Sequence, residues 1–527
     1  MLLKDVSELK FQNPRRSRTI VIGSGAVGLY TANELAKHGL EVVVIESGGV
    51  NLESFAPETY ASIGVKHDGI HTGRSKSLGG TTNLWGGQLV EFQPIDFSGR
   101  DWMPGSKWPV SYEEIAHYYK KTYENFGIEG EAQDDDRIWG NLLGVRPKFS
   151  EGLEIFLTRW LNIPSFAVAF SRQIRSSENL QVLMNHTVVG FHGSGDVNSC
   201  IKIVDRNGEK HTIEGSQFIL AAGTIETVRL LLHSAMATSW DCPWRNNTNV
   251  GACFQDHLSG TVATVQPDDK KAFFDTFCTI AWWGHKYQPK VRLTNRSLEQ
   301  TQILNIQGMF AFESSVSENL VYLKQFLKAA IYSRKVSGTK DLLVNLRACT
   351  KILLPLIWRY FLDHRIFVPS ASTISLLIQG EQVPIVESRI KIDPMQLDGD
   401  GLPKVILDWR VSGKEIISIR EFTTRCDRAL QTAKLARLQI NEDLMNLNPR
   451  FMSTLRDNNH QAGGALMGTS SQDGVVDSDL KVFGTTNLYI GGAAVFRTIS
   501  NANITFTALA FATRLVDHLT LGQHAVH

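Results

Sequence analysis

The stretch TIVIGSGAVGLYTANELAKHGLEVVVIESGG, residues 19–49, decides the fold of this chain. Its apolar start predicts a strand that ends at Ile22, and apolar side chains then recur at helical spacing over residues 29–36. The all-apolar run 42–45 predicts a second strand, buried on both faces. Between the first strand and the helix lies Gly-x-Gly-x-x-Gly, residues 23–28. Strand, glycine turn, helix and strand in this order predict a Rossmann-like unit that binds a dinucleotide.

Each glycine of the turn has its own mechanical role. Gly23 permits the tight turn, Gly25 lets the backbone approach a pyrophosphate, and Gly28 lets the helix pack close to the strand. The N–H groups at the helix start then hold the diphosphate. Glu46 ends the second strand, where an acidic side chain can bind ribose hydroxyls. The spacing alone does not separate FAD from NAD.

A second glycine-rich stretch, GRSKSLGGTTNLWGGQ, occupies residues 73–88. Two Gly-Gly pairs bracket Thr81 and Thr82, which suits a backbone wrapped against a flat cofactor better than two ordinary turns. Because this cluster follows a dinucleotide motif at the start of the chain, it favours a tightly held flavin.

Composition excludes several classes of protein. The chain has 527 residues, 43% of them hydrophobic and 20% charged, as in an ordinary soluble globular protein. Lys+Arg (54) and Asp+Glu (53) nearly cancel, so net charge gives no reason to expect a nucleic-acid partner. The six cysteines are scattered without any Cys-x-x-Cys, which argues against a zinc ribbon or a redox dithiol. We expect no metal.

The N-terminus and the middle of the chain bear on location. Charges interrupt every apolar run before residue 19, so a signal-peptide core is missing and we expect a cytoplasmic protein. No apolar stretch reaches the roughly 18–20 residues that span a bilayer. Residues 318–367 have a mostly helical pattern. We interpret them as an insertion packed on its own domain, with membrane-surface or lipid-linked-substrate contact, or a dimer interface, as alternatives.

Four further stretches resemble one family. NNHQAGGALMG, residues 458–468, and residues 474–519 look like the C-terminal signature of the glucose–methanol–choline (GMC) oxidoreductases. ILAAGTIETVRLLL, residues 219–232, and NVGACFQDH, residues 249–257, resemble two more elements of that family. Two other segments, residues 108–128 and 393–410, resemble a bacterial branch with sugar-oxidising and pyranose-oxidase-like members.

The resemblance implies an architecture. The fold class is α/β (α+β overall), with a Rossmann-like FAD-binding domain built from both chain ends, residues 1–265 and 440–527. An inserted β-sheet plus helical substrate-binding domain spans residues 266–439 and carries the helical insertion at about 318–367.

The resemblance also implies a mechanism, which residue chemistry supports. Removing hydride from an alcohol carbon requires the hydroxyl proton to leave, and neutral imidazole, with a reference pKa of about 6.5, is a suitable acceptor. His460 matches the family's motif histidine, and Asn503 matches the asparagine of its Asn-Pro-Thr; Asn501 is the competing asparagine. Hydride passes to flavin N5 and leaves a carbonyl product. We expect His257 to brace the domain junction.

The catalytic residues expected are His460 and Asn503. The residues expected to bind FAD are Gly23, Ser24, Gly25, Ala26, Val27, Gly28, Glu46, Ser47, Arg74, Gly79, Gly80, Thr81, Asn83, Leu84, Trp85, Gly86, Gly87, Val188, Ala222, Gly223, Ala493, Asn503, Ile504 and Thr505.

The chain departs from the family pattern at three places. Gly464 and Leu466 replace a threonine and an arginine, and Asn-Ile-Thr replaces Asn-Pro-Thr. In pyranose oxidases a Thr-His-Trp triplet carries the histidine bound to flavin, and Leu84 stands at that position here. Leucine cannot form the bond, so we predict non-covalent FAD.

The expected function is oxidation of a secondary hydroxyl of a sugar, glycoside, cyclitol or other polyol to a carbonyl, with O₂ or another electron acceptor. The alternatives are oxidation of a non-sugar alcohol, a GMC-fold lyase with structural FAD, and an NAD-dependent dehydrogenase.

Overall fold

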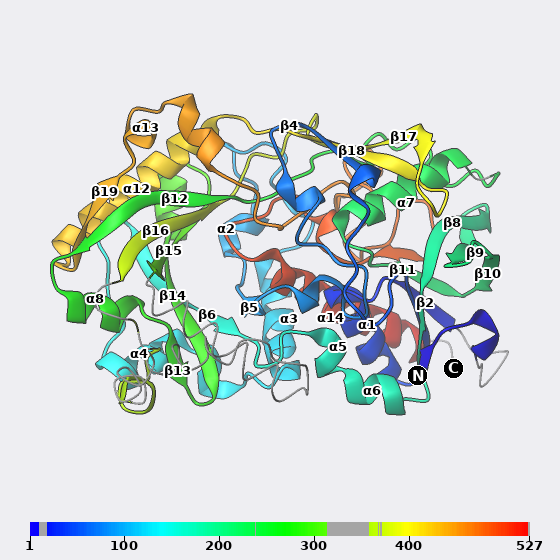
Figure 1. Ribbon diagram of the computed structural model, residues 1–527, viewed down its shortest axis with the longest axis horizontal. Helices are drawn as coiled ribbons and strands as arrows, with labels where there is room; N and C mark the ends of the chain where they lie inside the picture. The colour runs from blue at the N-terminus through cyan, green and yellow to red at the C-terminus, as the bar shows by residue number, and fades with distance from the viewer. Residues whose placement is uncertain (10–17, 238, 314–357, 367, 369–371, 525–527) are drawn as a thin grey trace, which may run out of the picture.

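A computed structural model of the protein describes residues 1–9, 18–237, 239–313, 358–366, 368 and 372–524. In Figure 1 the parallel sheet and its helices lie in the right half of the molecule, and a large antiparallel sheet lies in the left half. Most of the predicted helical insertion, residues 318–357 and 367, lies outside the described residues.

The parallel sheet has six strands, and every pairing in it is parallel. In sheet order the strands are β1 (Leu2–Leu3), β7 (Leu180–Met184), β3 (Glu41–Glu46), β2 (Arg18–Ile22), β11 (Gln217–Leu220) and β20 (Leu488–Ile490). All six residues of β3 are buried, as expected for a central strand covered on both faces. Strands from both chain ends therefore build one Rossmann-like sheet.

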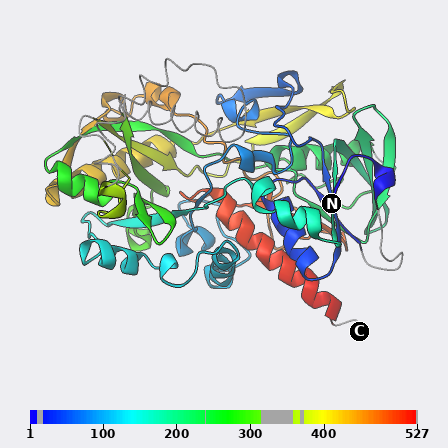
Figure 2. The ribbon, with the colours of Figure 1, turned by 60° about the horizontal axis from the view of Figure 1, so that its bottom comes forward.

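The helix α14 (Ile504–His524) joins the C-terminal end of the chain to this sheet. It packs against α1 (Ala26–Lys37) and α3 (Tyr112–Asn125), and Figure 2 shows it running beside α1. Buried hydroxyl pairs reinforce both contacts: Tyr30 with Thr513 at 2.8 Å, and Tyr119 with Thr507 at 2.7 Å.

The antiparallel sheet has eight strands. They are β19 (Ala436–Ile440), β12 (Leu258–Pro267), β16 (Thr373–Gly380), β15 (Ile306–Glu313), β14 (His285–Leu293), β6 (Leu153–Trp160) and β5 (Gln88–Leu89), with β13 (Ile280–Trp282) also paired to β14. The long helix α12 (Lys414–Thr432) covers one face, where the ring of Phe422 lies close to Gly308 of β15. Because side chains alternate along a strand, neighbouring Met309 points to the opposite face.

Two three-stranded sheets complete the described fold. One consists of β10 (Lys210–Glu214), β9 (Val197–Asp205) and β8 (His186–Ser194). The other consists of β17 (Arg389–Leu397), β18 (Pro403–Trp409) and β4 (Tyr60–Gly64). The remaining α-helices are α2 (Pro94–Phe97), α4 (Asp135–Leu143), α5 (Phe166–Ala169), α6 (Ser171–Ser176), α7 (Thr224–Ala237), α8 (Lys270–Phe277), α9 (Asn295–Thr301) and α13 (Glu442–Met445).

The predicted fold class is confirmed, with a parallel sheet fed by both chain ends and an antiparallel sheet beside it. The antiparallel sheet also takes β5, β6 and most of β12 from within residues 1–265, because each hydrogen-bonds to a strand of that sheet. The domain boundaries themselves stay a prediction. Within the described residues, no helix combines the length and apolarity needed to cross a membrane.

Candidate active site

A cavity of about 610 Å³ lies between the carboxyl ends of the parallel strands and the inner face of the antiparallel sheet. Ligands of open parallel sheets bind at these strand ends. Most of the residues predicted to bind the cofactor line this cavity, together with His460. Those in its wall are Gly23, Ser24, Gly25, Ala26, Val27, Glu46, Ser47, Arg74, Gly80, Thr81, Leu84, Trp85, Gly86, Val188, Ala222, Gly223, Ala493, Asn503, Ile504 and Thr505.

The glycine turn after β2 is sterically fixed. Gly23 has φ +100°, and a Cβ there would lie 2.6 Å from the carbonyl oxygen of Ala221. A Cβ on Gly28 would lie 1.9 Å from the carbonyl oxygen of Gly23. Beside Gly25, by contrast, a Cβ would meet nothing within 4 Å. The turn is therefore closed towards the protein and open towards the cavity, which fits a diphosphate held on backbone N–H groups.

Glu46 is bound to the same turn. One carboxylate oxygen accepts from the N–H and the hydroxyl of Ser24, at 3.0 and 2.6 Å, and the other accepts from the N–H of Gly48 at 2.8 Å. Burial raises the pKa of Glu46, and the hydrogen bonds from Ser24 and Gly48 oppose that effect. A carboxylate has about four acceptor positions, so Glu46 can brace the turn and still accept from a ligand hydroxyl.

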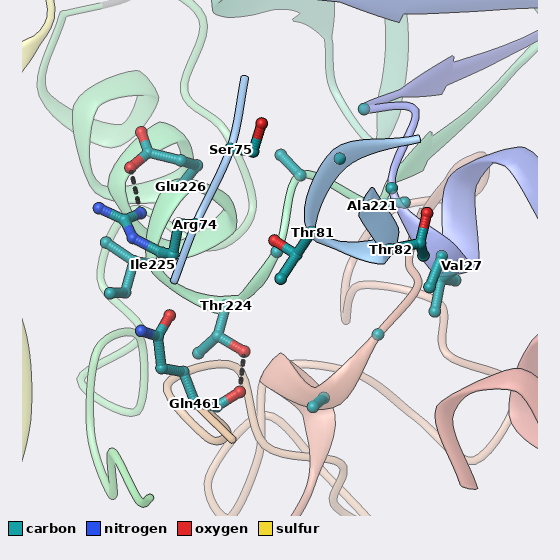
Figure 3. Close-up of a pocket in the computed structure, with 18 of the residues that line it drawn as sticks. Val27, Arg74, Ser75, Thr81, Thr82, Ala221, Thr224, Ile225, Glu226 and Gln461 are labelled. Carbon is teal, nitrogen blue, oxygen red and sulfur yellow. Dashed lines mark hydrogen bonds and ion pairs between the residues drawn. The ribbon is translucent and has the colours of Figure 1, made fainter. Parts of the chain in front are cut away.

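The second glycine cluster lies directly on the first. The N–H of Gly79 donates to the carbonyl of Ser24 at 3.1 Å, and a Cβ on Gly80 would lie 2.9 Å from the Cα of Gly25. Figure 3 shows Thr82 of this turn beside Val27 of α1. Only glycine permits such close backbone contact, which explains the repeated Gly-Gly pairs.

Arg74 points to the other end of the cavity. Its guanidinium donates to Glu226 at 3.1 Å, as Figure 3 shows, and lies over the rings of Phe55 and Tyr60 at 4.3 and 4.4 Å. Its charge is therefore paired within the protein.

Four predicted cofactor residues lie outside the cavity wall, and their contacts are with the protein. Gly28 and Gly79 shape the glycine turns as described above. The Asn83 amide donates to the carbonyl of Leu78 at 2.9 Å. The carbonyl of Gly87 accepts from the N–H of Leu161 at 2.8 Å. Sequence spacing does not distinguish such supporting positions from contact positions.

His460 and Asn503 meet at the cavity wall. The amide nitrogen of Asn503 lies 3.3 Å from Nε2 of His460, and its amide oxygen is buried without a partner among the described residues. Asn501 instead is buried away from the cavity, where its amide nitrogen donates to Asn305 at 2.7 Å. The backbone turn at 501–503 thus directs one asparagine into a polar network of the protein and the other to His460.

The partners of His257 assign the tautomer of His460. Nε2 of His257 lies 3.2 and 2.9 Å from the carbonyl oxygens of Ile499 and Ser500, so it carries the proton. Nδ1 of neutral His257 is then an acceptor, and Nδ1 of His460 lies 2.8 Å from it. Asn458 lies farther from that nitrogen, at 3.3 Å, and donates to Gln379 at 2.6 Å. His460 therefore keeps its proton on Nδ1 and presents the lone pair of Nε2 to Asn503.

Both imidazoles are neutral. Withdrawal from water, and after it the neighbouring His257, lower the pKa of His460 to about 3. Burial also lowers the pKa of His257. A neutral imidazole with an available Nε2 lone pair can accept a proton from a hydroxyl group that enters the cavity.

Asp256 anchors this pair. One of its oxygens accepts from the backbone N–H groups of His257, Asn458 and His460, at 2.7, 3.2 and 2.9 Å. The other lies 3.0 Å from Nε2 of His67. Burial opposes the charge, but the hydrogen bond from His67 and the nearby histidines hold the pKa of Asp256 below its ordinary value. An ionised carboxylate therefore lies directly behind His460.

Gly464 and Leu466, the two residues of the histidine motif that differ from the family pattern, lie outside the cavity wall. Gly464 has φ +86°, and a Cβ there would lie 2.7 Å from a methyl group of Val228. Threonine would be strained at this backbone conformation, so glycine is required here. Leu466 is buried with Ala252 and Cys253.

Sequence reasoning missed the wall on the side of the antiparallel sheet. Gln88, Trp160, Lys290, Met309 and Gln379 line the same cavity as His460. They come from five strands, β5, β6, β14, β15 and β16, which carry no glycine motif. Only the position of Gln88, directly after the second Gly-Gly pair, could have pointed to one of them.

Comparison with known proteins finds two family models that match this chain. Residues 384–512, which include His460 and Asn503, match the family model described as GMC oxidoreductase. Residues 18–272, which include both glycine turns, match the model described as FAD dependent oxidoreductase. The chain is therefore similar to the GMC oxidoreductases over residues 384–512 and to FAD-dependent oxidoreductases over residues 18–272. It is an FAD-dependent oxidoreductase that acts on CH–OH donors.

The proteins to which this chain is similar carry names with different substrates. The 6'''-hydroxyparomomycin C oxidase of Streptomyces lividus is 21% identical, over 96% of this chain and 92% of its own. The fructose dehydrogenase large subunit of Gluconobacter japonicus is also 21% identical, over 94% and 96%. The crystal structure of pyridoxine 4-oxidase from Mesorbium loti has the same fold, with a TM-score of 0.61 and 15% identity, and covers 97% of this chain and all of its own.

The close contact at Gly28 predicts loss of FAD in a Gly28→Ala variant. The added methyl group would collide with the carbonyl of Gly23 and displace the backbone that we predict to hold the diphosphate. We expect flavin content to fall by about tenfold or more, measured as flavin absorbance of the desalted protein. Gly140→Ala in α4, where a Cβ meets nothing within 4 Å, is the matched control and should keep its flavin. Full flavin content in Gly28→Ala would contradict the assignment.

Proposed function

We propose that the protein oxidises a secondary hydroxyl of a sugar, glycoside, cyclitol or related polyol to a carbonyl, with His460 as base and Asn503 as hydroxyl-positioning group. The observation that carries the proposal is the pair formed by Nε2 of His460 and the amide of Asn503, 3.3 Å apart at the cavity wall. A hydroxyl that approaches both groups from the cavity can donate its proton to Nε2 while its oxygen accepts from the Asn503 amide, in place of their direct contact.

The proton and the hydride leave the substrate separately. Bound FAD supplies the acceptor for the hydride. His460 takes the hydroxyl proton on Nε2, and the alcohol carbon becomes a carbonyl carbon. The resulting imidazolium donates from Nδ1 to His257, and the negative charge of Asp256 behind it favours the protonated form. His257 is a positioning residue, because it fixes the tautomer and does not line the cavity.

Two observations support a hydroxyl-rich substrate. Relatives are named for hydroxyparomomycin C and for fructose, both of which carry several hydroxyl groups. The substrate side of the cavity contains the amide side chains of Gln379 and Asn458, whose oxygens can accept hydrogen bonds from hydroxyl groups. The second half-reaction passes the electrons to O₂ or another acceptor, and both oxidases and dehydrogenases occur among the relatives.

The same proposal includes non-covalent FAD. Leu84, at the position of the flavin-bound histidine in pyranose oxidases, lines the cavity and cannot form the bond. No cysteine or tyrosine occurs among the described residues of the cavity wall. Besides His460 the wall holds His186, whose Nδ1 lies 2.8 Å from the carbonyl of Met184. The cytoplasmic location stays a prediction, as does membrane contact through the helical insertion.

Non-covalent binding predicts that acid releases the cofactor. The protein is precipitated with acid after desalting, and absorbance spectra are taken of pellet and supernatant. We expect the flavin bands in the supernatant, because no bond to the chain survives unfolding. Flavin that remains in the pellet would show a covalent link.

The role of His460 predicts that His460→Ala keeps FAD but loses turnover. We expect anaerobic flavin reduction by a sugar or polyol that bleaches the wild-type protein to slow by about 10²–10⁴-fold, because the proton acceptor is gone. The matched control is His117→Ala, an exposed position on α3. Near wild-type reduction in His460→Ala would exclude His460 as the base. A wild-type flavin that no alcohol bleaches would overturn the proposed function.

The role of His257 predicts a change in pH dependence. His257→Phe keeps the ring but removes the acceptor for the proton of His460. We expect flavin reduction about 10²-fold slower. Without an acceptor for Nδ1–H, the proton of His460 can move to Nε2, and the Nε2 lone pair is then lost.

The sign of the pH effect follows from the charges. His257 lowers the pKa of His460, so its removal raises that pKa and moves the acidic limb of the rate profile to higher pH. The wild type, with a pKa of about 3 for His460, should show no acidic limb from this group between about pH 5 and about pH 8. An unchanged rate and profile in His257→Phe would leave His257 a packing residue.

A further inference from the structure

Lys290 occupies an unusual position for a lysine. It lies on β14 with only 2% of its surface exposed, and it faces Met309 of β15 on the inner side of the antiparallel sheet. Both residues line the cavity that also contains His460 and Asn503. Lys290 is close enough to His460 that its charge helps to lower the pKa of that histidine.

The amine is held in place from one side. Nζ of Lys290 donates to the side-chain oxygen of Gln88 at 3.0 Å. The amide nitrogen of Gln88 in turn donates to Thr158 and Gln288, each at 2.8 Å, so the oxygen of Gln88 is fixed towards the lysine. An ammonium group has three N–H donors. One is used, and the structure describes no protein acceptor for the other two.

Three buried arginines among the described residues have carboxylate partners, and a fourth, Arg365, donates to the backbone carbonyls of Asp275 and Asp363. Arg100 donates to Glu381 at 2.8 and 2.7 Å, Arg159 to Asp135 at 2.7 Å, and Arg229 to Asp398 at 2.7 Å. Among the described residues, none forms such an ion pair with Lys290. Burial lowers the pKa of Lys290 to about 7, as expected for an ammonium without an anion beside it.

We propose that Lys290 binds an anionic oxygen of the substrate, so that the preferred substrates carry a carboxylate in addition to the reacting hydroxyl, as in a sugar acid or a hydroxy acid. The inference rests on the proposed function, because it takes His460 and Asn503 as the site of the reacting hydroxyl. A carboxylate would accept the two remaining N–H bonds and supply the missing charge partner.

The proposal also excludes a class of substrate. An ammonium group on the substrate at this end of the cavity would meet a like charge in a poorly solvated place. Amino sugars should therefore react less well than the matching neutral sugars, although a relative is named for hydroxyparomomycin C.

The test compares matched ligands on the FAD-loaded protein. Glucose, glucuronate and glucosamine form one series, and propane-1,2-diol and lactate form another. Dissociation constants are measured from changes in the flavin spectrum, and rate constants from anaerobic flavin reduction. In the wild type we expect at least one acid to exceed its neutral partner by about 10- to 100-fold in affinity and in second-order rate constant.

The variant Lys290→Met removes the charge and keeps the length of the side chain. We expect it to lose the preference for acids, so that each acid and its neutral partner differ by less than about threefold in the variant. Lys202→Met, at an exposed position of β9, is the control and should behave as wild type.

Three outcomes would overturn the proposal. In the first, neither acid binds the wild type more tightly than its neutral partner. In the second, the preference survives in Lys290→Met. In the third, Lys290→Met shifts the flavin midpoint potential and leaves the ligand preference unchanged, which would make the cofactor the partner of the ammonium. If acids bind but no ligand or other alcohol bleaches the flavin, the proposed function fails while the anion site stands.

Discussion

The active site depends on one buried carboxylate. Asp256 accepts hydrogen bonds from the backbone N–H groups of His257, Asn458 and His460, and so joins two segments about 200 residues apart. Without it these N–H groups would be buried without partners, which is costly in a protein interior. The same carboxylate places His257 beside His460, and the contact between the two rings then sets the tautomer of the base. Asp256 therefore fixes both the backbone positions of these residues and, through His257, the tautomer of His460.

This arrangement reconciles two opposing demands on the base. Exclusion of water keeps His460 neutral, so its Nε2 lone pair is available at ordinary pH. A base with so low a pKa is a poor proton acceptor unless something stabilises the charged product. The negative charge of Asp256 provides that stabilisation when the proton arrives, while the Nδ1 contact to His257 holds the ring in place. His460 is thus neutral before the reaction, and its protonated form is stabilised by the charge of Asp256 afterwards.

The two sides of the cavity obey different constraints. On the side of the parallel sheet, backbone atoms of the two glycine turns pack within van der Waals distance, and the added methyl group of an alanine would collide at Gly23 or Gly28. The family match over residues 18–272 includes both glycine turns. On the side of the antiparallel sheet, side chains on five different strands form the wall, and a substitution there changes polarity or charge without disturbing the strand pairing. Such a division lets one fold keep its cofactor while substrates differ.

The sequence by itself determined the parts of the protein that rest on local rules. The glycine spacing at residues 23–28 and the apolar runs around it predicted the first strand, turn, helix and strand, because turn sterics and hydrophobic periodicity act over a few residues. The resemblance at residues 458–468 led to His460, which the structure places at the cavity wall beside Asn503.

Only the tertiary structure decided which distant side chains meet. The partnership of His257 with His460 crosses 203 residues, and Lys290 enters the cavity through the register of β14 against β6 and β15. The sequence predicted neither contact. Strand register and sheet order depend on long-range hydrogen-bond pairing, and a single sequence carries no local trace of such pairing.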